Sequence, residues 1–180
     1  MNLLDLIKKR RSVRSFKSKE IPDKDLKKIL EAARWAPSAG NKQPLEIVVI
    51  KSEKKRTQLT KAALNQKFLK EPPVDLVICA NISRTKKKYG ERGAKLYAIQ
   101  DTAAATQNIH LMAKSLGYGT CWVGAFHEKR VAEVINAPSE IKPVAIIPIG
   151  IPDEDPQAPG RRDLEKMIYK DSYQNSYEME

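Results

Sequence analysis

The sequence predicts one domain that mixes α-helices and β-strands. Short aliphatic runs rich in β-branched residues are typical of buried strands. They alternate with segments in which apolar residues recur every three or four positions, as on one face of a helix. No internal repeat or low-complexity block interrupts the 180 residues, a length typical of one compact domain. We therefore expect residues 1–180 to fold together.

Two helices and a loop are expected at the start of the chain. Apolar residues within segment 3–7 indicate a short helix that ends in cations, where the helix dipole favours positive charge. A second apolar series indicates a helix that opens at Pro22 and stops near Trp35. Segment 38–44 is rich in Ser, Gly, Asn and Pro, which is typical of a loop.

The middle of the chain predicts two strands and two helices. Aliphatic runs at 47–50 and 74–79 indicate buried strands, and a lysine-rich helix is expected between them near 54–64. The longest helical pattern runs from about residue 93 to 116, and Gly117 is a natural C-terminal cap for it.

The last part of the chain predicts two further strands and an arm. Strands are expected at 120–124 and 144–149, with a short helix near 128–135 between them. After Gly150 the chain is rich in proline and carries only a few late apolar residues. Because segment 151–180 is too short to build its own core, we expect it to lie over the body or to reach a partner.

Composition excludes several classes of protein. With 41% hydrophobic and 31% charged residues, the chain carries too many aliphatic side chains for a disordered tail. Cys79 and Cys121 lie in apolar runs rather than in a spaced framework, which favours a reducing compartment. No run approaches the roughly 20 apolar residues of a membrane span, and the N-terminus meets charge too early for a signal peptide. We expect a soluble, cytoplasmic protein that does not bind membranes.

The charge of the chain allows two kinds of partner. Lys and Arg number 33 against 22 Asp and Glu, a formal net charge of +11, which suits nucleic acid and anionic small ligands equally. Most lysines are interleaved with carboxylates, as on solvated helix faces. Arginine clusters stand apart at 8–14 and at Arg161-Arg162, and the planar guanidinium fork suits phosphate better than lysine does.

Familiar catalytic motifs are not found. No glycine-rich loop ends in Gly-Lys-Ser/Thr, and the glycines at 117 and 119 lack the third glycine of a dinucleotide turn. His110 and His127 show no short pairing with a cysteine, so we expect no metal site. Nothing in the sequence around Cys121 indicates an activated thiol.

Four motifs remain, and they fit one another. They are Arg-Arg-Ser-Val-Arg at 10–14, Pro-Ser-Ala-Gly-Asn-Lys-Gln-Pro at 37–44, Gly-Tyr-Gly-Thr-Cys-Trp-Val-Gly at 117–124 and Gly-Arg-Arg at 160–162. Each motif is weak alone. In this order and at these intervals, they resemble the FMN-dependent nitroreductase family over essentially the whole chain.

The resemblance implies an α+β fold in which helices flank a central, mostly antiparallel sheet. It further implies an intertwined homodimer that binds two FMN molecules at its interface. Residues 1–180 would then be one FMN-binding domain, with 151–180 as an extended C-terminal arm.

The resemblance also implies a set of FMN ligands. The phosphate, the ribityl chain and the pyrimidine edge would be held by an early cluster, namely Arg10, Arg11, Ser12 and Arg14. The flavin of the other chain would be reached by loop residues, namely Pro37, Ser38, Ala39 and Asn41. The ring would be lined by Trp122, Val123 and Gly124, with a backbone N–H facing the flavin N5, which carries the hydride. The polar edge and the phosphate would be completed by Asn65, Gln66, Arg161 and Arg162.

The residue types agree with this ligand set. FMN has a dianionic phosphate at one end and a flat ring whose pyrimidine edge gathers negative charge on reduction, so cations are wanted at both ends. Small residues in segment 38–40 allow the backbone to approach the ring face.

The family resemblance implies an oxidoreductase that uses NADH or NADPH to reduce nitroaromatics, quinones or similar conjugated acceptors in two-electron, ping-pong steps. The sequence leaves open the choice of donor, the acceptor and the possibility of a dehalogenase-like or dehydrogenase-like activity. Two alternatives also stay open, an FMN-binding protein with little turnover and a small basic nucleic-acid-binding domain. Segment 83–92 must supply most of any cover over the substrate face, because the chain is short for this family.

Overall fold

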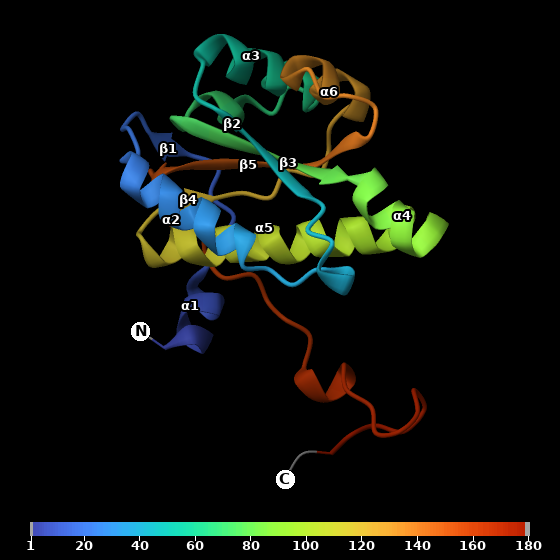
Figure 1. Ribbon diagram of the computed structural model, residues 1–180. Coiled ribbons are helices and arrows are strands. Elements are labelled where there is room, and N and C mark those ends of the chain that lie inside the picture. Colours follow the sequence, from blue (N-terminus) through green and yellow to red (C-terminus); the bar gives the residue numbers. More distant parts are fainter. Residues whose placement is uncertain (1, 179–180) are drawn as a thin grey trace.

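A five-stranded antiparallel sheet lies at the centre of the computed structural model, which describes residues 2–178, and helices cover both faces of the sheet (Figure 1). The strands are β1 (Phe16–Lys17), β2 (Leu45–Ile50), β3 (Val74–Asn81), β4 (Gly119–Thr120) and β5 (Ile141–Pro152). Their order is β1-β5-β3-β2, and β4 pairs with β5 beside β1. The expected α+β class with a mostly antiparallel sheet is confirmed.

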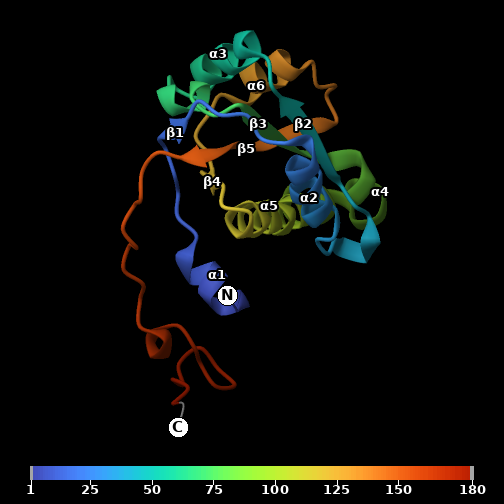
Figure 2. The same cartoon turned by 90° about the vertical axis from the view of Figure 1, so that its left-hand side faces the viewer.

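Two helical layers enclose the sheet. The helices are α1 (Leu3–Lys9), α2 (Asp23–Arg34), α3 (Glu53–Ala62), α4 (Ile82–Arg92), α5 (Ala98–Ser115) and α6 (Glu128–Ile135). Helices α2 and α5 cover one face, and α3 and α6 cover the other (Figures 1 and 2). Short helical turns are η1 (Ala39–Asn41), η2 (Lys67–Lys70), the π-helical η3 (Gly93–Tyr97) and η4 (Leu164–Lys166).

The two cores follow from the alternation of side chains along the central strand. Val74, Leu76 and Ile78 of β3 pack into the core formed with α2 and α5. Val77 and Cys79 point to the opposite face and pack into the core formed with α3 and α6. Because β3 is paired on both edges and covered on both faces, its run of aliphatic residues is buried almost throughout.

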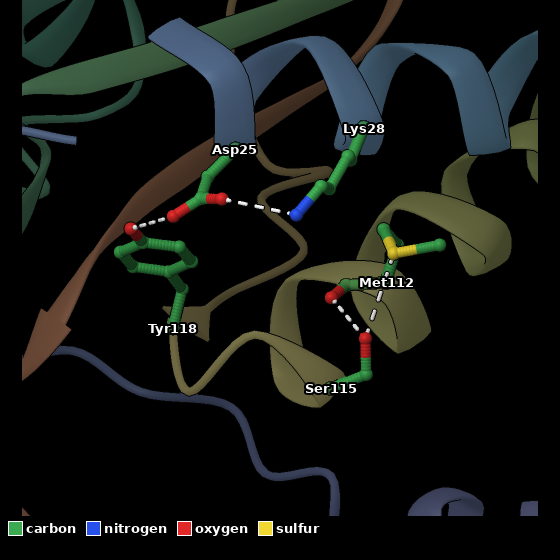
Figure 3. A network of polar contacts seen from close by, with 5 residues as sticks. All are labelled: Asp25, Lys28, Met112, Ser115 and Tyr118. Atoms are coloured by element: carbon green, nitrogen blue, oxygen red, sulfur yellow. Dashed lines mark hydrogen bonds and ion pairs between the residues drawn. The ribbon is translucent and has the colours of Figure 1, made fainter. Parts of the chain in front are cut away.

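A small polar network fixes the end of α5 against α2 (Figure 3). The Tyr118 hydroxyl donates to Asp25 Oδ2 at 2.9 Å, and Lys28 Nζ lies 3.6 Å from the other oxygen of that carboxylate. Burial raises the pKa of Tyr118, and the hydrogen bond and negative charge of Asp25 raise it further, so the phenol remains protonated and donates. The Ser115 hydroxyl donates to the carbonyl of Met112 at 2.8 Å within the last turn of α5. These contacts hold Tyr118, the residue that directly precedes β4, against α2.

The strand expected at 120–124 is shorter than the sequence predicts. Strand β4 ends at Thr120, and pairing resumes only at Val123, whose N–H and C=O exchange 3.0 Å hydrogen bonds with Ile146. Cys121 and Trp122 lie between the two pairings. The interruption leaves the Trp122 side chain 42% exposed.

The helix expected from residue 93 is also interrupted. The α-helical part, α5, begins at Ala98, and residues 93–97 form a π-helical turn. Helix α4, for which segment 83–92 carried no helical prediction, precedes this turn. Gly90 breaks the regular conformation with φ +57° and ψ −144°, which is strained for a residue with a side chain. Gly117 has the expected left-handed conformation after α5, with φ +87°.

Both ends of the chain leave the layered body (Figure 2). Helix α1 buries none of its residues, and Leu3 and Leu4 are 67% and 57% exposed. Strand β5 retains residues 151–152, after which the C-terminal arm extends away from the helices. Within residues 2–178, no helix has the length and apolar content needed to cross a bilayer.

Candidate functional site

The basic segment 10–14 lies against strand β4. Ser12 forms a parallel bridge with Thr120, and the Val13 N–H donates to the Thr120 carbonyl at 2.9 Å. A Cβ at Gly119 would lie 2.9 Å from the Val13 side chain, so only glycine allows this close approach. The sequence motif at 117–124 thus positions the motif at 10–14.

Arginines from the two ends of the chain meet beside this segment. Burial lowers the pKa of Arg10, and the positive charges of Arg161 and Arg11 lower it further. The Arg161 guanidinium also donates to the carbonyls of Pro159 and Gly160, at 3.1 and 3.0 Å. Among the ion pairs of the described residues, none involves these three arginines. Such a cluster has the charge and the donor groups that suit an anion with more than one negative charge.

Among the described residues, one acidic side chain, that of Glu154, hydrogen-bonds to segment 10–14, and it contacts the backbone rather than the arginine side chains. Glu154 accepts hydrogen bonds from the backbone N–H groups of Arg14 and Ser15. This contact ties the segment to the beginning of the C-terminal arm. A hollow of about 50 Å³ lies between them, lined in part by Arg10 and Arg11.

A stacked pair of rings lies next to the arginines. The imidazole of His110 stacks on Trp122 with ring centroids 5.8 Å apart, and its Nδ1 lies 2.7 Å from the Thr120 hydroxyl. Burial, helped by the charge of Arg10, lowers the pKa of His110 to about 4, so the ring is neutral at pH 7. Its Nε2 is buried and has no partner among the described residues.

The thiol beside this pair is not activated. Burial raises the pKa of Cys121, although Arg14 and Arg10 partly oppose that effect. Cys79 is buried in the sheet, and burial raises its pKa to about 12. Both cysteines are free thiols, as the sequence predicts for inert buried residues.

The turn at 65–66 joins the same region. The Gln66 side chain donates to the carbonyls of Ala63 and Ala125, each at 2.9 Å, which places it next to Gly124. Asn65 is exposed and has a left-handed conformation with φ +58°. Gln66 thus adjoins the end of segment 122–124, while segment 10–14 lies against Thr120 and within range of the charge of Arg161.

The loop at 37–44 is held elsewhere. The Ala39 N–H donates to both oxygens of Asp101, at 3.1 and 3.2 Å, and the Gln43 N–H donates to the Ser38 hydroxyl at 2.9 Å. The Gln43 side chain donates to the Asn41 side chain at 3.0 Å. A pocket of about 210 Å³ lies behind the loop and includes Pro37. Asp101 has a raised pKa because it is partly buried, an effect that Ala39 opposes.

Helix α5 separates this loop from the arginine cluster. Asp101 lies in its first turn, and His110 lies nine residues further along, where it contacts Thr120 of β4. The helix rises about 1.5 Å per residue, so Asp101 and His110 lie roughly 14 Å apart along its axis. A single chain does not bring the two parts of the predicted site together. Arg162 also points elsewhere, because its guanidinium donates to the Lys166 carbonyl of the arm at 2.9 Å.

The grouped residues suit an amphipathic ligand. Three guanidiniums without carboxylate partners suit a phosphate, and the partly exposed Trp122 ring, backed by the buried His110 ring, offers a flat apolar surface. Within residues 2–178, no three His, Cys, Asp or Glu side chains gather as a metal site would require.

Comparison with known proteins decides the family. The model of the nitroreductase family matches residues 7–67 and 57–151. This chain belongs to the nitroreductase family. A relative from Methanothermobacter thermautotrophicus, provisionally named an NADH dehydrogenase/NAD(P)H nitroreductase, is 33% identical over 168 residues that cover 91% of this chain and 83% of the relative. The nitroreductase resemblance of the sequence is thereby confirmed.

Solved structures of this nitroreductase family have the same fold. A nitroreductase family protein from Clostridium novyi NT superposes with a TM-score of 0.78 at 31% identity, covering 98% of this chain and 97% of that one. Nitroreductase A from Vibrio parahaemolyticus superposes with a TM-score of 0.89 at 27% identity, covering 97% of this chain and 78% of that one.

Several site residues have no signal in the sequence. Asp101, which fixes the loop, is one acidic residue on a helix face, and Glu154 is one of several carboxylates in the arm. The sequence shows only that His110 has no short pairing with a cysteine, and its stacking on Trp122 depends on how α5 meets β4. The motif at 117–124 indicates the importance of this strand, but only the fold places α5 behind it.

Proposed function

We propose that this nitroreductase-family protein is an NAD(P)H-dependent FMN oxidoreductase that reduces nitroaromatics, quinones or similar conjugated acceptors. The grouping of Arg10 with Arg11 and Arg161, near the His110 ring that stacks on Trp122, carries this proposal. It is supported by a Bacillus subtilis relative named FMN reductase [NAD(P)H], which is 25% identical over 94% of this chain and 73% of the relative.

The arginines hold the charged parts of FMN. Arg10, Arg11 and Arg161 bind the phosphate, because their mutual repulsion is relieved by a dianion. Ser12 and Arg14 extend from the same segment toward the ribityl chain and the pyrimidine edge. Arg162 takes no part in this phosphate site in the single chain, because its guanidinium donates to the Lys166 carbonyl.

The ring lies over the strand that follows β4. Trp122, Val123 and Gly124 line it, and the interrupted pairing of this strand leaves backbone groups free to face the ring. Asn65 and Gln66 provide amide groups at the polar edge, and Gln66 is held in place by the Ala125 carbonyl. Bound FMN supplies hydride-transfer chemistry between the donor and the acceptor.

Neither histidine donates a proton in this reaction. His110 is neutral at pH 7 and supports Trp122 from behind, while His127 precedes α6 and donates its backbone N–H to Ala62. Solvent supplies the proton that accompanies reduction of the acceptor.

The working unit is a homodimer. Helix α1 presents Leu3, Leu4 and Ile7 to solvent in a single chain, and the C-terminal arm exposes further apolar side chains, including Met167 and Tyr173. The loop of one chain, through Pro37, Ser38, Ala39 and Asn41, reaches the FMN held by its partner. Two chains thus complete a site whose halves lie at opposite ends of α5.

The cytoplasm is the compartment that suits this chain. Its two cysteines are buried free thiols, and free thiols persist in a reducing environment.

Purification and denaturation test the proposal. We expect a yellow protein that releases free FMN on heating, together with oxidation of NADH or NADPH by a panel of quinones and nitroaromatics. A protein that releases FAD, or that stays colourless after incubation with FMN, refutes the cofactor. A flavin-loaded protein that turns over none of the acceptors indicates a flavin-binding protein instead. Steep salt-dependent binding to nucleic acid without a chromophore indicates the basic-domain alternative.

A further inference from the structure

Helix α4 lies at the end of α5 opposite to α1 (Figure 1). A basic and aromatic surface there lies beside the loop at 37–44. It is formed by α4 and η3, residues 82–97. This segment carries six Lys and Arg residues against one carboxylate. The function proposed above uses none of them.

Glycines fold this surface into one unit. The chain turns at Gly90, and a Cβ at Gly93 would lie 2.6 Å from the carbonyl oxygen of Thr85, so α4 and η3 pack backbone against backbone. This packing sets the rings of Tyr89 and Tyr97 edge to face, with centroids 5.2 Å apart. Two aromatic rings therefore share one partly exposed surface.

Only some of the cations on this surface have carboxylate partners among the described residues. The one acidic residue of the segment, Glu91, is already paired with Lys86 at 2.7 Å and Lys95 at 3.5 Å. Lys88 lies over the Tyr89 ring at 5.2 Å, and Arg92 lies over the Tyr97 ring at 5.5 Å. Neither cation has a carboxylate partner within residues 2–178. The surface thus combines flat rings with unneutralised positive charge.

The loop brings this surface to the proposed flavin. A Cβ at Gly40 would lie 2.3 Å from the Tyr89 hydroxyl and 2.8 Å from Lys88 Nζ. The basic surface therefore begins where Ser38 and Ala39 of the same loop reach the FMN in the proposed dimer. A ligand that extends from the flavin face across the loop meets Lys88 and Tyr89 first.

We propose that α4 and η3 bind the adenosine end of NADPH and select it over NADH. The adenine ring stacks against the partly exposed tyrosines, and the 2′-phosphate is bound by Lys88 and by the Nη groups of Arg92, whose Nε donates to the Tyr97 hydroxyl. NADH offers no such phosphate, so it gains only the stacking contribution. This inference rests on the function proposed above, since it assigns the donor of that reaction.

Calorimetry and kinetics on the full-length, FMN-loaded protein test the donor site. The calorimetric probes are 2′,5′-ADP and 5′-AMP, which do not require turnover. We expect wild-type protein to bind 2′,5′-ADP more tightly than 5′-AMP. In Lys88→Gln and Arg92→Gln, kcat/KM for NADPH and affinity for 2′,5′-ADP should each fall about tenfold, the loss expected for one charge-assisted contact. The same variants should keep kcat/KM for NADH and their FMN content.

Two further variants sharpen the test. Tyr89→Phe should retain binding of both donors, and Tyr89→Ala should weaken both, because adenine is common to them. Lys129→Gln on α6, an exposed lysine on the other helical layer, is the matched charge control and should change nothing.

Failure of this inference is distinguishable from failure of the proposed function. Equal binding of 2′,5′-ADP and 5′-AMP, or equal losses for the two donors in Lys88→Gln, overturns the donor site even if the enzyme is active. Competition by a single-stranded oligonucleotide but not by 2′,5′-ADP assigns the surface to nucleic acid and also overturns it. Absence of FMN or of all turnover overturns the proposed function, while calorimetry still decides the nucleotide site.

Discussion

Replacement of Arg161 by alanine separates the binding of FMN from the stability of the protein itself. In the structure, the charge of Arg161 lowers the pKa of Arg10, so the two guanidiniums repel each other in the free protein. Removal of Arg161 relieves this repulsion, and we expect the flavin-free protein to unfold at the same temperature as wild type or slightly higher. The flavin-loaded protein should lose stability, because the contact to the phosphate disappears.

The size of the loss in FMN binding follows from the cluster. A desolvated charge pair contributes about 2–5 kcal/mol when one partner is truncated, and two arginines remain here to hold the phosphate, so we expect the lower part of that range. A loss of about 2–3 kcal/mol weakens binding by roughly 30- to 150-fold. Fluorescence titration of the flavin-free protein with FMN measures this change.

A matched control identifies the cause. Arg130→Ala removes an exposed arginine from α6, on the opposite helical layer, and should leave FMN affinity unchanged. Wild-type affinity in Arg161→Ala would refute the phosphate assignment. A lower melting temperature of the flavin-free Arg161→Ala protein would refute the repulsion between the arginines.

Three other perturbations test the remaining arguments. Initial rates with varied donor and quinone should give parallel double-reciprocal plots, and His110→Ala should retain substantial turnover; intersecting lines would exclude a shared binding face. Deletion of residues 161–180 should reduce dimer stability and flavin content together, and a truncated protein that light scattering and absorbance show to be dimeric and flavin-loaded would contradict the role of the arm. Asp75 is buried in β3, both of its carboxylate oxygens lack partners among residues 2–178, and burial raises its pKa well above the usual value despite the charge of Arg56. Asp75 therefore holds its proton more tightly in the folded protein than in the unfolded chain. The contribution of Asp75 to the free energy of unfolding falls as pH rises above about 3.8 toward the raised pKa. Urea unfolding at several pH values should show this fall in wild type relative to Asp75→Asn. Both proteins contain His110, whose lowered pKa has the opposite effect on stability, so the comparison isolates Asp75. Equal pH dependence of the two proteins would disprove the role of Asp75.

Local patterns predicted most of the helices and the central strands. The second helix was expected to open at Pro22 and stop near Trp35, and α2 runs between these two residues as its caps. Apolar spacing, a proline at the start and the interruption after Trp35 act within a few residues of one another, so the sequence contains them directly. The helix expected near 128–135 coincides with α6 for the same reason.

Elements that depend on distant partners were less predictable. Strand β1 has only two residues and exists because β5 extends to pair with it. Segment 120–124 has strand composition, but its pairing is limited by where β5 offers partners. In α4, the polar composition hid a helix that packs on η3 through Gly93.

The candidate site shows the same division between sequence and structure. Motif order and spacing alone identified the segments 10–14, 37–44 and 117–124, because the residue types that bind phosphate and allow close backbone approach are visible in the sequence. Only the tertiary structure decided that His110 stands behind Trp122 and that α5 separates the loop from the arginines. These contacts join residues far apart in the chain. Their geometry depends on how the helices pack across the sheet, which no local pattern encodes.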